Sequence, residues 1–227
     1  MTFSLRNFRP ERTSSRAAAV LAAALLAVFA GLAVIAHRYG SGTGIDHRTL
    51  AWMVIHRRSW LTSAAVDVTD IGSPSAISVA TVIATLAIWR STHSMRTAAT
   101  VAVAVVSAFC LAAVTKWAVG EHRPPSSAQL VAETGWSFPS GHVTGTTALV
   151  GMLAVVIAHH HSGWRRLATL LTAVIAVMLV ASSRLYLGDH WMVDVLAAIV
   201  LSTSVVTIAA AALNPTGTRT RSPYPIA

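Results

Sequence analysis

Residues 17–36 read AAAVLAAALLAVFAGLAVIA, an unbroken apolar run without one charged side chain. A helix needs about 20 predominantly apolar residues to cross roughly 30 Å of hydrocarbon, so this run predicts a transmembrane helix. Val34-Ile35-Ala36 loosely resembles the cleavage site of a secretory signal, but the apolar region of such a signal usually spans only about 7–15 residues. We therefore interpret the run as an uncleaved membrane anchor.

Five further apolar runs follow, and the composition agrees with a membrane protein. Hydrophobic residues make up 54% of the 227 residues and charged residues only 11%, with a mean hydropathy of +0.62. Soluble domains carry roughly 25% charged residues, so this composition excludes an ordinary soluble protein and a disordered chain. We expect an all-α fold, a bundle of six transmembrane helices. The expected spans are 17–36, 73–89, 97–118, 142–158, 166–182 and 190–213.

The basic residues predict the orientation. A net charge of +9 would suggest a nucleic-acid partner in a soluble chain. Here the basic residues lie between apolar runs, where they act as topology signals, and no nucleic-acid partner is expected. With the N-terminus in the cytoplasm, ten basic residues lie inside and seven outside, which predicts a multi-pass protein of the cell membrane with both termini cytoplasmic. The inner ten are Arg6, Arg9, Arg12, Arg16, Arg90, Arg96, Arg165, Arg166, Arg219 and Arg221, and the outer seven are Arg38, Arg48, Arg57, Arg58, Lys116, Arg123 and Arg184.

The chain divides into short segments around one membrane domain. We expect residues 1–16 to form a cytoplasmic N-terminal segment, 17–213 a single six-helix domain and 214–227 a disordered tail that contains three prolines. Residues 56–71 carry apolar side chains three or four apart, which predicts a helix lying on the outer surface. Cys110 is the single cysteine, so an intrachain disulfide is excluded.

Polar groups form three clusters at span ends that face the predicted outer side. Ionisable groups at such places are costly enough to need a reason. Taken singly, each group has an ordinary interpretation, such as a snorkelling lysine, an interfacial arginine, a helix-start serine or a structural histidine hydrogen bond. Together they bring three cations, two histidines and a carboxylate to one face. The clusters are Lys116 with Arg123-Pro124, then Pro139-Ser140-Gly141-His142, then Ser183-Arg184 with His190 and Asp194.

This collection suits a multiply charged oxyanion such as a phosphate. Arg123 and Arg184 can each bind phosphate oxygens through two hydrogen bonds, and Lys116 adds a point charge. The backbone N–H groups around Ser140 and Gly141 open the fourth span and favour an anion, and a glycine lets a phosphate approach the main chain closely. The same donors can stabilise the charge that develops during phosphoryl transfer.

The third cluster supplies a candidate nucleophile. His190 and Asp194 are four residues apart on one predicted helix and therefore share a face. Asp194 can hold one ring nitrogen protonated and leave the other free for attack, and His142 can protonate the leaving oxygen. An acidic cluster suited to Mg²⁺ is not apparent in the sequence at this face. The residues therefore indicate metal-independent hydrolysis of a phosphoester without a cofactor.

The three clusters resemble the signature of the type 2 phosphatidic acid phosphatase superfamily, which also includes vanadium haloperoxidases. That signature is Lys, six residues and Arg-Pro; then Pro-Ser-Gly-His; then Ser-Arg, five residues, His, three residues and Asp. Every specified position matches, in order, between the third and sixth spans. The chain reads Lys116-WAVGEH-Arg123-Pro124, Pro139-Ser140-Gly141-His142 and Ser183-Arg184-LYLGD-His190-WMV-Asp194.

The resemblance implies a role for each residue. His190 would form a phosphohistidine and Asp194 would orient it, while His142 would act as general acid and then as the base that activates water. The resemblance also implies an all-helical core, no metal requirement and catalysis at the outer membrane–water interface. The implied phosphate ligands are Lys116, Arg123, Ser140, Gly141 and Arg184.

A lipid phosphate is the expected substrate, because a membrane scaffold lets an acyl or prenyl tail stay in the bilayer. We prefer a polyprenyl (undecaprenyl or decaprenyl) diphosphate, with phosphatidylglycerophosphate or phosphatidate as the alternative. A different class of function is a phospholipid-binding protein or transporter without hydrolysis, against which the intact His142, His190 and Asp194 argue. Haloperoxidase chemistry is not expected, since those relatives are soluble. The sequence does not predict an oligomeric state.

Three polar features have no firm assignment from the sequence. Asp189 can tune His190 or cap the sixth helix. Glu121 and His122 can face the headgroups or lie exposed to solvent. The run His159-His160-His161 resembles a metal-binding tract, but we interpret it as a solvated connector on the cytoplasmic side.

Overall fold

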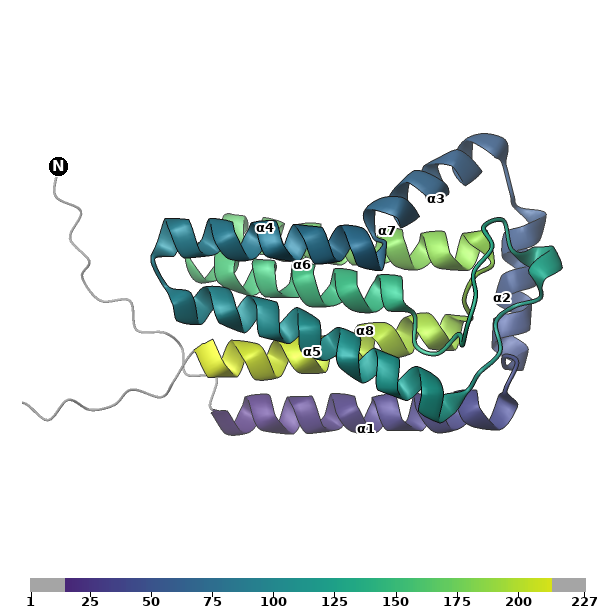
Figure 1. Cartoon of the computed structure of the whole chain (residues 1–227), viewed down its shortest axis with the longest axis horizontal. Coiled ribbons are helices and arrows are strands. Elements are labelled where there is room, and N and C mark those ends of the chain that lie inside the picture. Colours follow the sequence, from purple (N-terminus) through teal and green to yellow (C-terminus); the bar gives the residue numbers. More distant parts are fainter. Residues whose placement is uncertain (1–14, 214–227) are drawn as a thin grey trace, which may run out of the picture.

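The computed structural model describes residues 15–213, and within that range the fold is all helical (Figure 1). Six of the helices are long and apolar enough to cross a membrane, which confirms the expected six-span, all-α architecture. The predictions for residues 1–14 and for the tail 214–227 lie outside the described residues. The spanning helices are α1 (Ser15–Tyr39), α4 (Pro74–Thr92), α5 (Met95–Val119), α6 (Gly141–His159), α7 (Gly163–Leu187) and α8 (Met192–Leu213).

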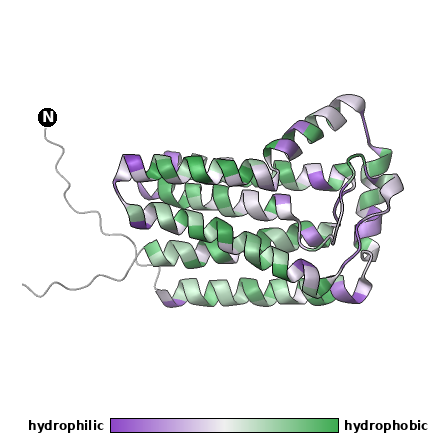
Figure 2. Ribbon diagram, viewed as in Figure 1, coloured by the Kyte–Doolittle hydropathy of each residue, from purple (hydrophilic) through white to green (hydrophobic). Residues whose placement is uncertain are grey.

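The long helices lie side by side along one direction (Figure 1). Helix α8 packs against α1, α5 and α6, and α6 also packs against α7. Helices α5 and α7 finish at the same end of the bundle at which α6 and α8 begin, and we call this the site end. Figure 2 shows apolar residues along the long helices, whereas hydrophilic residues gather near their ends and in the connectors.

Small side chains let the helices approach one another closely. The buried face of α5 is a stripe of alanine and valine that includes Ala98, Ala104 and Ala108. Such residues favour helix association in membranes, because lipid tails are as apolar as leucine and close packing has to supply the attraction. A Cβ on Gly145 of α6 would lie 2.3 Å from Cζ of Phe109. Glycine at this position therefore makes room for the Phe109 ring where α6 packs against α5.

Two shorter helices lie at the site end. Helix α3 (Ser59–Ile71) confirms the helix expected within residues 56–71, whereas α2 (Gly44–Ile55) is absent from the sequence-based prediction. The start of α2 is a capping box, in which the Thr43 hydroxyl accepts from the Asp46 N–H (3.3 Å) and the Asp46 carboxylate accepts from the Thr43 N–H (2.7 Å). The Thr-x-x-Asp pattern is thus a signal that could have located α2.

Helix α7 is longer than expected at the site end. The expected span stops at residue 182, whereas α7 continues to 187 and includes Ser183 and Arg184 in its last turns. Gly188 ends the helix in the left-handed conformation (φ +79°), and a Cβ there would lie 2.3 Å from the Ala128 carbonyl oxygen. Arg184 is therefore held on a helix rather than on a connector.

Helix α8 begins later than expected. Its first residue is Met192, so the prediction that His190 and Asp194 lie on one helix is wrong. The Asp194 carboxylate accepts a hydrogen bond from the Trp191 N–H (2.9 Å), because N–H groups at a helix start have no partner within the helix. His190 lies in the α7–α8 connector just before this start.

Candidate active site

The site end brings together all eight residues that the sequence singled out. They come from the ends of four helices and from two connectors, so the site exists only in the folded bundle. The charged neighbours of His142 include Arg184, Arg123 and Lys116, which places the three clusters within electrostatic reach of one another. The residues are Lys116 at the end of α5, Arg123 in the α5–α6 connector, Ser140, Gly141 and His142 at the start of α6, Arg184 at the end of α7, His190 in the α7–α8 connector and Asp194 at the start of α8.

His190 is held in a single tautomer. Its Nδ1 lies 3.1 Å from Oδ2 of Asp194, and its Nε2 lies 3.2 Å from Nη1 of Arg123. A guanidinium can only donate, so Nε2 carries the lone pair and Nδ1 carries the proton. Burial, followed by the positive charges of Arg123 and Arg184, lowers the pKa of His190 well below its ordinary value. The imidazole is therefore neutral at pH 7, as nucleophilic attack requires.

Asp194 is fully buried, and its Oδ2 accepts three hydrogen bonds. The donors are Nδ1 of His190 (3.1 Å), the Trp191 N–H (2.9 Å) and the hydroxyl of Ser137. Ser137 Oγ also lies 3.3 Å from Nδ1 of His190. Ser137 is missing from the sequence-based prediction, because it reaches the site only through the path of the α5–α6 connector and no spacing pattern marks it.

Lys116 binds the main chain of the α5–α6 connector. Its ammonium donates to the carbonyl oxygens of Trp136 (2.9 Å) and Ser137 (3.1 Å). A snorkelling lysine would direct its ammonium toward water, whereas Lys116 directs it at two carbonyl groups beside the His190–Asp194 pair. Lys116 therefore belongs to the site and also fixes the connector that carries Ser137.

The two arginines contact an acidic residue, Glu133, that no pattern in the sequence marks. Arg184 is 1% exposed and its Nη2 lies 2.7 Å from Glu133, while Nη2 of Arg123 lies 3.6 Å from the other Glu133 oxygen. Burial alone would raise the pKa of Glu133, but Arg184 and Arg123 hold that pKa below its ordinary value. Glu133 is thus an ionised carboxylate that contacts both arginines, where a phosphate is expected to bind.

Asp189 holds Arg184 and does not cap α8. Its Oδ2 lies 3.1 Å from Nη1 of Arg184, which also donates to Thr69 of α3 (2.7 Å). Within residues 15–213 neither Asp189 oxygen has a regular hydrogen bond, and N–H groups at the start of α8 are bound by Asp194 and Asp46 instead. Burial raises the pKa of Asp189 to about 6, although Arg184 opposes this shift. The suggested capping role is therefore wrong.

At the start of α6, the Ser140 hydroxyl is buried without a hydrogen-bond partner among the described residues. It does not cap the helix. A Cβ on Gly141 would only touch Cγ of Pro74 at 3.8 Å, so packing alone does not demand a glycine there. A helix start with free donors and an open approach to the main chain suits an oxyanion.

Glu121 is fully buried (0% exposed). The sequence suggests that it faces the headgroups or lies exposed to solvent, and both predictions are wrong for Glu121. The neighbouring His122 is exposed. The signal lies one residue earlier, since Gly120 ends α5 in the left-handed conformation (φ +64°). Glycine at this position commonly ends a helix and redirects the chain, and here Glu121 follows that turn.

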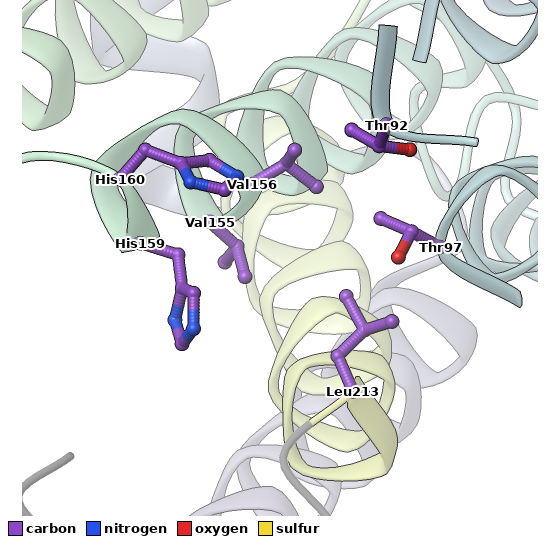
Figure 3. A pocket seen from close by; sticks show the side chains of 7 residues that line it. All are labelled: Thr92, Thr97, Val155, Val156, His159, His160 and Leu213. Carbon is purple, nitrogen blue, oxygen red and sulfur yellow. The ribbon is translucent and has the colours of Figure 1, made fainter. Parts of the chain in front are cut away.

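A cavity of about 200 Å³ lies at the other end of the bundle (Figure 3). It is lined by Thr92, Thr97, Leu213 and the exposed His159 and His160, among others. Within residues 15–213, three or more His, Cys, Asp or Glu side chains never gather in a way that could hold a metal ion. The exposure of His159 and His160 agrees with a solvated connector, and this cavity has no part in the site.

Fold and site together define a class of protein: a multi-pass, all-helical membrane protein in which cations surround a buried His–Asp pair. The chain belongs to the PAP2 superfamily, whose sequence profile matches residues 97–216, more than half of the chain. This finding confirms the resemblance drawn from the three sequence clusters.

A protein sequence and a solved structure, both from Bacillus subtilis, are similar to this chain. Phosphatidylglycerophosphatase B of strain 168 is 38% identical over 79 residues, an alignment that covers 34% of this chain and 38% of that relative. The chain is thus matched to little more than a third of the relative's length. A crystal structure described as the first transmembrane PAP2 type phosphatidylglycerolphosphate phosphatase has the same fold, with a TM-score of 0.75 and 23% identity over 88% of this chain and 98% of that one.

Proposed function

We propose that the protein is a lipid phosphate phosphatase that hydrolyses phosphatidylglycerophosphate. One observation carries the reaction: Nε2 of His190 holds a lone pair beside Arg123, while Asp194 binds the other ring nitrogen. The names of the similar sequence and of the similar structure support the substrate. They favour phosphatidylglycerophosphate over the polyprenyl diphosphate preferred on sequence grounds.

In the first step, Nε2 of His190 attacks the phosphorus and the bond between phosphorus and the lipid oxygen breaks. A phosphohistidine forms, and His142 donates a proton to the leaving oxygen so that the lipid departs as an alcohol. Asp194 stabilises the positive charge that develops on the His190 ring. Arg123 has to release Nε2 before attack and transfers that donor to a phosphate oxygen.

In the second step, water attacks the phosphorus of the phosphohistidine. His142, neutral after the first step, takes a proton from this water. The phosphorus–nitrogen bond breaks, inorganic phosphate leaves and the lone pair returns to Nε2 of His190. Lys116, Arg123 and Arg184 stabilise the charge on the phosphoryl oxygens in both transition states, which is why the scheme has no step that needs a metal ion.

Phosphate release by the detergent-purified protein in excess EDTA tests this proposal. Phosphatidylglycerophosphate, phosphatidate and a polyprenyl diphosphate are compared, with His190→Ala as the control. We expect preference for phosphatidylglycerophosphate, lost in the variant and unaffected by EDTA. A preference for the polyprenyl diphosphate would overturn the substrate, and no release from any lipid would favour a lipid-binding protein without catalysis. Activity that EDTA abolishes would overturn metal independence.

A further inference from the structure

We propose that Glu121 is a positioning residue that, as a neutral carboxylic acid, donates a hydrogen bond to Oδ1 of Asp194 and so fixes the partner of His190. This inference rests on the proposed function, since it concerns the same nucleophile. Glu121 is fully buried, and it has no role in the two-step reaction proposed above for His190 and His142.

The geometry ties Glu121 to the centre of the site. Its backbone carbonyl accepts the Ser137 N–H (2.8 Å), and Ser137 in turn donates to Asp194. The carboxyl groups of Glu121 and Asp194 are direct neighbours and interact with each other. Both carboxyl oxygens of Glu121 and Oδ1 of Asp194 are buried without any regular N–H or O–H donor from residues 15–213. One shared proton satisfies both groups, whereas two ionised carboxylates in contact would repel each other.

The distribution of donors shows which carboxyl group holds the proton. Oδ2 of Asp194 accepts three hydrogen bonds, from His190, Trp191 and Ser137. Neither oxygen of Glu121 accepts a regular hydrogen bond within the described residues. Hydrogen bonds to a carboxylate favour its charged form. The negative charge therefore resides on Asp194, and the proton resides on Glu121.

The groups around Glu121 oppose its ionisation. Burial, followed by the carboxylate of Asp194 and then that of Asp46 from α2, raises the pKa of Glu121 to about 9. The Gly42 N–H approaches the carboxyl group and acts the other way, but without the geometry of a regular hydrogen bond.

Other ionisable groups of nearby elements are engaged elsewhere. The ammonium of Lys116 from α5 binds the carbonyls of Trp136 and Ser137. His37 of α1 donates to the carbonyl of Val119 (2.9 Å), and His190 binds Asp194 through Nδ1. The neutral form of Glu121 at pH 7 follows from this arrangement.

With Glu121 as a donor, the Asp194 carboxylate is hydrogen-bonded at both of its oxygens. Asp194 is held at Oδ2 by His190, Ser137 and Trp191 and at Oδ1 by Glu121, so its plane cannot rotate freely. Without Glu121, the buried Oδ1 would lack a donor, and Asp194 would accept a proton more readily or turn away from Nδ1 of His190. Either change weakens the control of the His190 tautomer on which attack by Nε2 depends.

Two substitutions separate the hydrogen bond from the volume of the side chain. Glu121→Gln keeps an N–H donor to Asp194, and Glu121→Leu keeps a similar volume without one. We expect Glu121→Leu to lower kcat for phosphatidylglycerophosphate by about 10- to 100-fold, because a buried hydrogen bond to a charged group is lost. KM should stay within about twofold, since Glu121 does not touch the substrate. Glu121→Gln should restore kcat to within about threefold of the wild type.

The outcomes separate this inference from the proposed function. If the wild-type protein releases no phosphate, the proposed function fails. If the wild type is active and Glu121→Leu retains its kcat, or Glu121→Gln is as slow as Glu121→Leu, the positioning role is wrong. Asp67→Asn, which removes an exposed carboxylate on α3, is the matched control and should leave kcat and KM unchanged.

An infrared measurement tests the proton itself and does not depend on activity. Difference spectra taken as the pH rises through about 9 should show the loss of the carbonyl band of a protonated carboxyl group in the wild type and in Asp67→Asn. The same band should be absent from Glu121→Gln. A band of equal size in Glu121→Gln would assign the proton to another group and overturn the proposal.

Discussion

At the scale of single residues, two contacts and burial suit His190 to the nucleophilic role that we propose for it. Asp194 accepts the Nδ1 proton, Arg123 faces the lone pair of Nε2, and burial with nearby positive charge keeps the ring neutral. In the proposed mechanism the same Arg123 contact occupies the attacking atom, so substrate binding and activation of His190 would be coupled. A phosphate that binds Arg123 would free Nε2 of His190 as the substrate arrives.

Gly141 provides a test at this scale. We expect Gly141→Ala to change the free energy of unfolding by less than about 1 kcal/mol, because a Cβ there meets only Pro74 at 3.8 Å. It should lower kcat/KM by roughly 10- to 100-fold, since a methyl group would separate the phosphate from the main-chain N–H groups. Gly44→Ala, at the first residue of α2 with open space around it, is the control. Loss of folding, or unchanged kcat/KM, would contradict this role for Gly141.

The shifted pKa of Glu121 predicts a dependence of stability on pH. The pKa of Glu121 is raised from 4.5 to about 9 in the folded protein. Between these two pH values the carboxyl group is protonated in the folded protein but ionised in the unfolded chain, so the unfolded state gains stability as the pH rises. The stability of the wild type therefore falls relative to Glu121→Gln as the pH rises from 4.5 to about 9. The Tm of the wild type minus the Tm of Glu121→Gln should fall as the pH rises through this window, and a constant difference would exclude the shift.

Residues with a fixed spacing could be predicted, and residues that depend on tertiary contact could not. Lys116, Arg123 and Asp194 belong to short patterns whose chemistry is recognisable in the sequence. Ser137 and Glu133 have no such pattern, because they reach the site only through the path of the α5–α6 connector. Their positions depend on how the helices pack, which composition and periodicity do not specify.

At the scale of elements, the α5–α6 connector both builds the site and occupies it. Lys116 fixes the connector through two carbonyl groups, and Ser137 supplies a hydroxyl to Asp194. The same connector places Glu133 against Arg184 and Arg123. If the proposed phosphate ligands are right, a substrate phosphate would have to displace this carboxylate, and its greater negative charge would favour the exchange.

Removal of the Glu133 charge should therefore strengthen the binding of anions. We expect Glu133→Gln to lower KM for phosphatidylglycerophosphate and the inhibition constant of inorganic phosphate by about two- to fivefold, since a partly exposed ion pair contributes at most about 1 kcal/mol. Steady-state kinetics with and without added phosphate measure both constants. Asp67→Asn is again the control. An increase in both constants would show that Glu133 organises the arginines rather than competes with the phosphate.

Element boundaries illustrate what hydropathy detects and what it misses. The six long apolar runs predict α1 and α4 to α8, because a span of this length has few alternatives to a helix. Helix α2 is too short and too polar for this criterion, and its start depends on the Thr43–Asp46 capping box. The sequence places the start of the last span at residue 190, whereas α8 begins at Met192. Its start depends on the hydrogen bond from the Trp191 N–H to Asp194, which hydropathy does not detect.

At the scale of the whole molecule, the bundle separates two polar ends. The described chain begins and ends at the end opposite to the site, so an even number of spans places both limits of this region on the same side. The count over the full sequence, ten basic residues assigned to that side against seven on the site side, predicts that it is cytoplasmic. The site would then face the extracytoplasmic side of the membrane.

Labelling of single cysteines tests this orientation. In a Cys110→Ser background, Ser127→Cys places a thiol in the exposed short helix Ser126–Ala128 of the site end, and Ser162→Cys places one in the α6–α7 connector. A membrane-impermeant maleimide should label Ser127→Cys in intact cells and Ser162→Cys only after permeabilisation. The reverse pattern would place the site in the cytoplasm.

The most direct test of the central claim, that His190 is the nucleophile, is to trap the phosphorylated enzyme. The protein is mixed with phosphatidylglycerophosphate that carries a radiolabel in its terminal phosphate, and the reaction is quenched in alkaline detergent because phosphohistidine is acid-labile. We predict acid-labile label on the peptide that contains His190 and none in His190→Ala. Label that persists in His190→Ala, or rapid phosphate release without any labelled enzyme, would contradict the account.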